Sequence, residues 1–226
     1  MIPGLFMPPG FMRGQEPLGY TKIAYGSSAA TGTSVTVNTN ATIEPGNYII
    51  IVAARENDGT TPRTLSAVSL AGSASEAATI LRQQSNNNNG VCVLAVCGVV
   101  SALSQSGVNV SIILSAGVNG GIGVWIYRVR GIANPTTAYS ADSNASGCSL
   151  STPPNGGMAF AVVQGTSPVT YNSSHGAGSV DPDVRTHEAN ADSHVVVVQS
   201  VTPGMPSTAF GISTNRGAAG VVLAAA

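Results

Sequence analysis

Charged side chains are scarce in this chain of 226 residues: Asp, Glu, Lys and Arg together make up 8%, against about 25% in an ordinary soluble domain. Nine basic and ten acidic residues leave a net charge of −1, and Lys22 is the only lysine. Proteins that bind nucleic acids need clustered Lys and Arg to displace counterions from phosphates. The composition therefore argues against a nucleic-acid partner.

Cysteines, aromatic residues and long apolar runs are also few. Three cysteines cannot form a closed set of disulfides, and we expect Cys148 to lie in a polar loop. No run approaches the roughly 18 apolar residues that cross a bilayer, so we expect no membrane partner. The apolar start of the chain lacks a basic region and is broken by prolines, which argues against an export signal.

Sequence motifs for catalysis are missing as well. The chain has no Gly-x-Ser-x-Gly nucleophile motif and no Gly-rich phosphate loop with a lysine. A carboxylate pair for glycoside hydrolysis is the remaining enzymatic alternative, drawn from Glu44, Asp58 and the acidic residues between Asp181 and Asp192. Because aromatics make up only 5%, a sugar-processing cleft is disfavoured, and we expect neither enzymatic activity nor a cofactor.

The densest polar cluster contains Asp181, Asp183 and His187. Carboxylates and imidazoles can hold a divalent ion where they converge. Their spacing matches no established metal loop, so we expect a solvated loop between strands and no bound metal.

The dominant pattern is that of β-structure. Short runs rich in Val, Ile and Thr alternate with turns containing Asn-Gly or Pro-Gly. The predicted strands are 33–38, 47–54, 64–70, 91–100, 108–115, 122–130, 136–141, 158–164, 169–172, 195–201, 208–213 and 218–224. One short helix is predicted over residues 74–84.

Many short strands predict an all-β fold, a jelly-roll-like antiparallel β-sandwich that forms a single domain over residues 23–226. Strands such as 48–54 and 194–199 are apolar at every position or nearly so. A sandwich strand with one face in water should alternate instead, so some outer faces should be covered by loops, by the N-terminal segment or by other subunits. Together with the low charge, this pattern predicts a homo-oligomer packed against neighbours.

Residues 1–22 differ in kind from the rest, since they are rich in Pro, Gly and Met and show no strand alternation. We expect an extended arm that docks in a groove of a partner; the alternative is an arm folded back on its own sandwich. The side chains expected to dock are Ile2, Leu5, Phe6, Met7, Phe11 and Met12.

Residues 122–130 predict a strand with two distinct faces. Trp125 and Tyr127 should point to one side, and Arg128 and Arg130 to the other. These four residues are candidates for surface recognition of a sugar or a partner; the alternative is a core tryptophan beside an arginine-bearing solvent face.

Three segments resemble a β-sandwich family common among structural proteins of tailed bacteriophages: 43–53 (IEPGNYIIIVA), 121–130 (GIGVWIYRVR) and 215–222 (NRGAAGVV). The opening MIPGLF is similar to the starts of small virion proteins encoded by phages. The resemblance implies a virion location, partners among capsid or tail proteins, and no catalytic residues.

We therefore expect a non-enzymatic component of a phage particle, either a decoration protein or a head-spike or fibre protein, held on the capsid by its N-terminal arm. The alternative is a tail or fibre-tip module that binds a host-surface glycan or receptor.

Overall fold

The computed structural model describes residues 16–55, 62–86, 92–118, 120–144, 147–166, 171–174, 180–186, 192–201, 203, 207–212 and 217–226. These residues form strands, turns and loops, with no helix among them, so none of the described segments is a helix that could cross a membrane. The arm residues predicted to dock, from Ile2 to Met12, lie outside the described residues.

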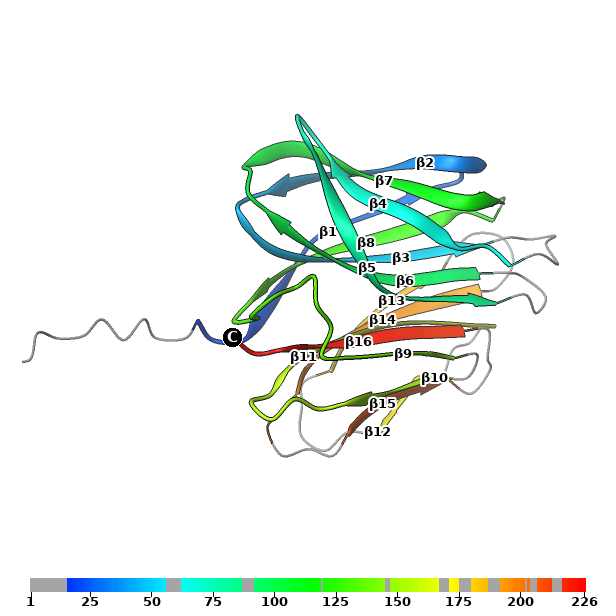
Figure 1. Cartoon of the computed structure of the whole chain (residues 1–226). Helices are drawn as coiled ribbons and strands as arrows, with labels where there is room; N and C mark the ends of the chain where they lie inside the picture. The colour runs from blue at the N-terminus through cyan, green and yellow to red at the C-terminus, as the bar shows by residue number, and fades with distance from the viewer. Residues whose placement is uncertain are drawn as a thin grey trace, which may run out of the picture.

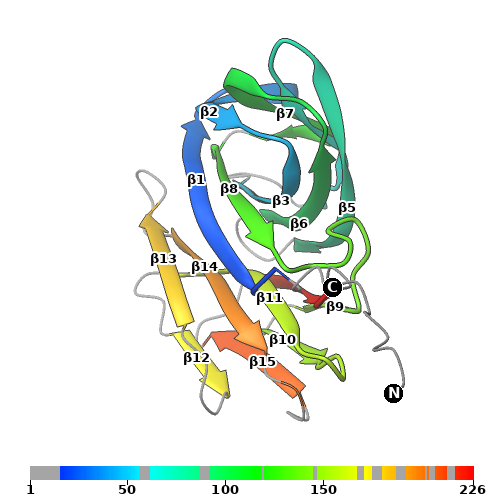
Figure 2. The same ribbon diagram turned by 90° about the vertical axis from the view of Figure 1, so that its left-hand side faces the viewer.

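The first eight strands follow one another from residue 19 to residue 130. They are β1 (Gly19–Ser28), β2 (Gly32–Ile43), β3 (Gly46–Arg55), β4 (Leu65–Ala71), β5 (Ser75–Asn86), β6 (Cys92–Ser101), β7 (Gln105–Val118) and β8 (Ile122–Arg130). Their order in space is β1-β8-β3-β6-β5-β4-β7-β2, and every neighbouring pair is antiparallel. This is the strand order of a jelly roll, two Greek keys wrapped around one core. β1 and β2 lie side by side where the sheet nearly closes on itself (Figure 2).

The next eight strands repeat this topology. They are β9 (Ser140–Asn144), β10 (Gly147–Ser151), β11 (Gly157–Thr166), β12 (Tyr171–Ser174), β13 (Val180–Thr186), β14 (Asp192–Val201), β15 (Ser207–Ile212) and β16 (Gly217–Ala224). Counted from β9 as the first strand, the five-stranded sheet reads 1-8-3-6-5 and the three-stranded sheet reads 2-7-4. The same order, 1-8-3-6-5-4-7-2, describes β1–β8, so the chain contains two jelly rolls in tandem. The prediction of a jelly-roll-like antiparallel β-sandwich is confirmed.

The two rolls stack as four layers of strands (Figure 1). The outer sheet of the first roll contains β2, β7, β4 and the start of β5, and its inner sheet contains β1, β8, β3, β6 and the rest of β5. The first core cluster fills the space between these sheets. A second cluster packs the inner sheet against the five-stranded sheet of the second roll. A third cluster, made of small side chains, lies between the five-stranded and three-stranded sheets.

This stacking explains why some strands are apolar throughout while others alternate. Ile50 and Val52 of β3 point into the first cluster, whereas Ile49 and Ile51 point into the second. β2 has only one covered face, and its residues alternate between buried and exposed. The continuous apolar runs in the inner sheet are thus covered by the second roll of the same chain, and they require no neighbouring subunit.

The predicted helix over residues 74–84 is wrong, because this segment belongs to strand β5. Ala77, Ile80 and Leu81 have the i, i+3, i+4 spacing of a helix face. In the structure β5 pairs with β4 up to Ala78 and with β6 from Thr79 onward, and a bulge between Ile80 and Arg82 lies within the pairing with β6. A bulge inserts an extra residue and breaks the two-residue alternation of a strand. The apolar residues of β5 therefore show a spacing that is also typical of a helix.

Most of the other strand predictions are confirmed, with four misses and two shifts. The strand predicted over 169–172 overlaps β12 only at Tyr171 and Asn172, and residues 169 and 170 lie outside the described residues. β1, β5, β10 and β13 were not predicted as strands, since all four are short of apolar runs. The strand predicted over 136–141 begins only at Ser140, because residues 131–139 form a linker that runs beside β16. Gly98 of β6 makes room for this linker: a Cβ there would collide with the carbonyl of Pro135.

The predicted arm over residues 1–22 overlaps the first sheet, because β1 begins at Gly19. Just before it, residues 16–18 press against Gly131, whose φ of +67° suits glycine. A Cβ on Gly131 would lie 2.5 Å from the Glu16 carbonyl oxygen. The prediction of one domain over 23–226 stays a prediction, since the shared second cluster favours it and the repeated topology favours two units.

Candidate functional site

The aromatic pair predicted for surface recognition is buried. Trp125 has 0% of its surface exposed and Tyr127 has 2%, because both point into the second core cluster between the rolls. The Trp125 ring lies 5.1 Å from that of Tyr25, and the Tyr127 ring lies 6.0 Å from that of Phe160. Surface recognition by these two side chains is therefore wrong for the folded chain, and the alternative of a core tryptophan holds.

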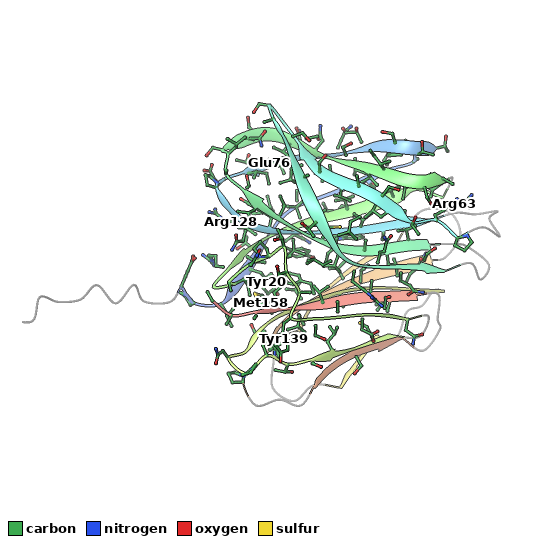
Figure 3. All side chains as sticks on the ribbon, viewed as in Figure 1. Tyr20, Arg63, Glu76, Arg128, Tyr139 and Met158 are labelled. Atoms are coloured by element: carbon green, nitrogen blue, oxygen red, sulfur yellow. The ribbon has the colours of Figure 1, made fainter. Side chains whose placement is uncertain are left out.

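The two arginines of the same strand do lie at the surface, as the alternation predicts. Arg130 is exposed and Arg128 is half-buried, both on the side of β8 opposite Tyr127. They sit beside two hollows at one end of the first roll, of about 400 Å³ and 300 Å³. Figure 3 shows Arg128 at the end where Tyr20 also lies.

Of the carboxylates that were considered for hydrolysis, Glu44 is the one whose side chain the structure describes. Glu44 accepts a hydrogen bond of 2.9 Å from the Ser104 hydroxyl, and Asp58 lies outside the described residues. Glu76 accepts bonds from the Ser101 hydroxyl at 2.7 Å and the Ala102 amide at 2.9 Å, which ties β5 to the turn after β6. Glu44 and Glu76 thus each accept hydrogen bonds that hold a turn in place.

The polar cluster considered for a metal falls only partly within the described residues. The backbone of Asp181 and Asp183 belongs to β13, so this segment is a strand rather than the loop that was expected. His187 lies outside the described residues. In the parts of the chain that the structure describes, no group of three or more His, Cys, Asp or Glu side chains is placed to hold a metal ion.

Cys97 and Cys148 are core residues. Cys97 points into the first cluster, and Cys148 is buried in the third, so the prediction of a polar loop at Cys148 is wrong. Burial raises the pKa of each thiol from 9.0 to about 12, with the charge of Asp142 adding to the effect on Cys148. Both thiols are free and remain protonated at neutral pH, which makes them poor nucleophiles.

A feature that the sequence analysis missed is the outward face of the outer sheet. The adjacent strands β2, β7 and β4 contain no Asp, Glu, Lys, Arg or His anywhere in their length. We call the outward side chains of these strands the uncharged face. Most of its members carry a hydroxyl, an amide or a single methyl group, and the large apolar exception is Ile113, which is 45% exposed. They include Ser34, Thr36, Asn38, Asn109, Ser111, Ile113, Ser115, Ala67, Ser69 and Ala71.

The uncharged face is regular because the strands are in register. Thr36 lies opposite Ser111, which lies opposite Ser69 on the next strand. In the row beside it, Ser34, Ile113 and Ala67 are neighbours in the same way. The signal was present in the sequence: alternating strands without charge at their exposed positions. The order that brings the three strands together could not be derived from it.

No protein-family model, no curated protein and no solved structure matches this chain.

Proposed function

We propose that the chain is a non-catalytic assembly protein of a phage particle, in which the uncharged face packs against neighbouring subunits or capsid proteins. The observation that carries the proposal is the absence of charge from β2, β7 and β4. Charged residues are depleted at the centre of protein interfaces, because removing an ion from water costs several kcal/mol while a hydroxyl that finds a partner costs little.

The size of the uncharged face indicates what kind of contact it can make. Three strands about 4.8 Å apart and about 20 Å long present roughly 300 Å². A stable pair of proteins buries about 800 Å² on each partner. One such contact is therefore weak alone, and it suits a subunit that is also held by a second contact. The candidate for that second contact is the apolar segment of residues 1–15.

The phage location is supported by the resemblance of residues 43–53, 121–130 and 215–222 to virion β-sandwiches. The jelly-roll topology agrees with that resemblance but hosts many functions, so it carries no functional argument alone. The alternative of a module that binds a host glycan or receptor no longer has aromatic candidates for the contact, because Trp125 and Tyr127 are buried.

The direct test is the copy number of the protein in purified particles of the phage whose genome encodes it, measured by quantitative mass spectrometry. We expect a stoichiometric component, with many copies indicating a capsid location and a few copies a tail or a vertex. Particles that lack the protein would refute the proposal.

The role of the uncharged face is tested with Thr36→Lys combined with Ser111→Lys, which places two cations opposite each other on it. Both positions are accessible, so folding should be retained, and incorporation into particles should fall at least tenfold. Asn155→Lys adds a cation at an exposed turn of the second roll and should leave incorporation unchanged. Equal incorporation of the unaltered protein, the double lysine variant and Asn155→Lys would show that the face is not an interface.

A further inference from the structure

The end of strand β8 carries two guanidinium groups on one side of the inner sheet. Arg128 and Arg130 are two residues apart, so they point the same way. That side is the one that lines the inside of the first roll, since Ile126, Val124 and Ile122 of the same strand belong to the first core cluster. Both arginines follow the last residue that β8 supplies to this core, and Figure 3 shows Arg128 at this end of the first roll.

Glycines on the two neighbouring strands leave room for these side chains. β8 lies between β1 and β3, with Gly19 opposite Arg130 and Tyr48 opposite Arg128. A Cβ on Gly19 would lie 3.4 Å from Arg130 Nη2, and a Cβ on Gly46 would lie 3.4 Å from Arg128 Nε. The guanidinium groups thus occupy space that a side chain at Gly19 or Gly46 would crowd, while Arg130 stays exposed and Arg128 half-buried.

Two hollows open beside the arginines. The larger, of about 400 Å³, is lined by both arginines together with Gly46, Asn47 and Gly131, among others. The smaller, of about 300 Å³, lies on the side of Thr21 and Ile23. Their lining mixes backbone, hydroxyl and aliphatic groups, so a small polar molecule could be accommodated.

The hydrogen-bonding capacity of this arginine pair is largely unused. Arg128 donates one bond of 3.1 Å from Nη2 to the carbonyl of Pro45. Each guanidinium carries five N–H donors. Among the residues that the structure describes, neither arginine forms an ion pair with a carboxylate. Glu16 lines both hollows without reaching ion-pair distance.

We propose that this arginine pair binds a carboxylate. The planar fork of a guanidinium matches the two oxygens of a carboxylate, and such charge-assisted bonds are about twice as strong as neutral ones. Because Glu16 and Ala226, the last residue of the sequence, also line the larger hollow, the excess positive charge there is at most one, which favours a singly charged group over a dianionic phosphate. The carboxylate can belong to an acidic sugar or to an acidic side chain of a protein. This inference does not depend on the proposed function.

Calorimetric titration of the full chain at low salt tests the proposal. The probes are glucuronate, glucose as its neutral counterpart, and an Asp residue blocked at both ends. We expect glucuronate or blocked Asp to bind and glucose not to bind, with affinity that falls as salt is added. Tighter binding of glucuronate assigns the site to acidic sugars, and tighter binding of blocked Asp assigns it to acidic peptides. Absence of binding by both acids would overturn the proposal.

Variants locate the binding and separate it from folding. Arg130→Gln should weaken binding by about tenfold or more, the usual effect of losing hydrogen bonds to a charged group. Arg82→Gln removes the same charge from β5, where Arg82 bonds to Ser143, and should leave binding unchanged. Because Arg130 is exposed, its replacement should not alter the unfolding midpoint.

Glu16→Gln gives the sharpest outcome. If the ligand is an anion beside Glu16, removing this competing charge should strengthen binding by roughly twofold to fivefold. An unchanged affinity for Arg130→Gln, or a weaker affinity for Glu16→Gln, would show that carboxylates bind elsewhere on the molecule.

Discussion

The shared core between the two rolls makes a specific prediction about their unfolding. Phe160 is fully buried on β11, in the second roll, and its ring contacts Tyr127 on β8, in the first roll. Phe160→Ala should cost about 3–5 kcal/mol, as buried Phe-to-Ala changes do. With a urea slope of about 3 kcal/mol per molar, expected for a chain of this size, the unfolding midpoint should fall by about 1 to 2 M.

Trp125 provides the assay, because it is the only tryptophan and lies in the first roll. Its fluorescence and the far-UV circular dichroism should report one coincident transition in the native protein and in Phe160→Ala. Val163→Ala is the companion variant, since Val163 points into the third cluster, which contains only residues of the second roll. It should also lower the midpoint reported by Trp125, by a smaller amount.

Two results would refute this reasoning. If Val163→Ala shifts the circular dichroism but leaves the Trp125 transition in place, the rolls unfold independently despite their shared cluster. If Phe160→Ala costs less than about 1 kcal/mol, the second cluster is not packed as the structure has it.

The remaining predictions concern two buried glutamines and the buried thiols. Gln164 is fully buried, and neither polar atom of its amide has a hydrogen-bond partner among the residues that the structure describes. Gln164→Leu should therefore raise stability by about 1–3 kcal/mol, measured by urea unfolding. Gln105→Leu should lower stability instead, because Gln105 accepts a bond from the Ala74 amide at 2.9 Å. In a Cys92→Ser variant, the remaining thiols should react with a disulfide reagent at pH 8 only after unfolding. Because burial raises the pKa of Cys97 and Cys148 from 9.0 to about 12, the unfolded thiols ionise first, so stability should fall as pH rises from 9 toward 12; an unchanged urea midpoint between pH 8 and pH 10.5 would contradict this.

Residue pattern alone predicted the fold class and most of the strands, because period-two alternation and turn residues are local signals. β2 shows this best, with Val35, Val37 and Ile43 inward and Thr36 outward. The tandem arrangement could not be predicted, because the repeat lies in strand order and not in similar residues. The runs that are apolar on both faces correctly indicated covered surfaces, but nothing local could indicate that the cover was the second half of the same chain.

The site was harder to predict than the fold. Alternation correctly separated Trp125 and Tyr127 from Arg128 and Arg130, but which side faced solvent depended on the second roll. Gly46 and Gly131 line the hollow beside the arginines, and Gly19 lies next to Arg130. These glycines come from three different segments. Only the folded registers bring those glycines next to β8.

The position of β16 has a consequence for how the chain matures during synthesis. β16 is the last strand in chain order, yet it lies between β11 and β9 within the five-stranded sheet. It supplies Val221 and Leu223 to the cluster between the rolls and Val222 to the third cluster. While the ribosome still holds these residues, β11 lacks one of its two partners and the inner sheet of the first roll lacks part of its cover. The five-stranded sheet is therefore completed only after β16 has left the ribosome, and until then the nascent chain exposes apolar strands of the inner sheet.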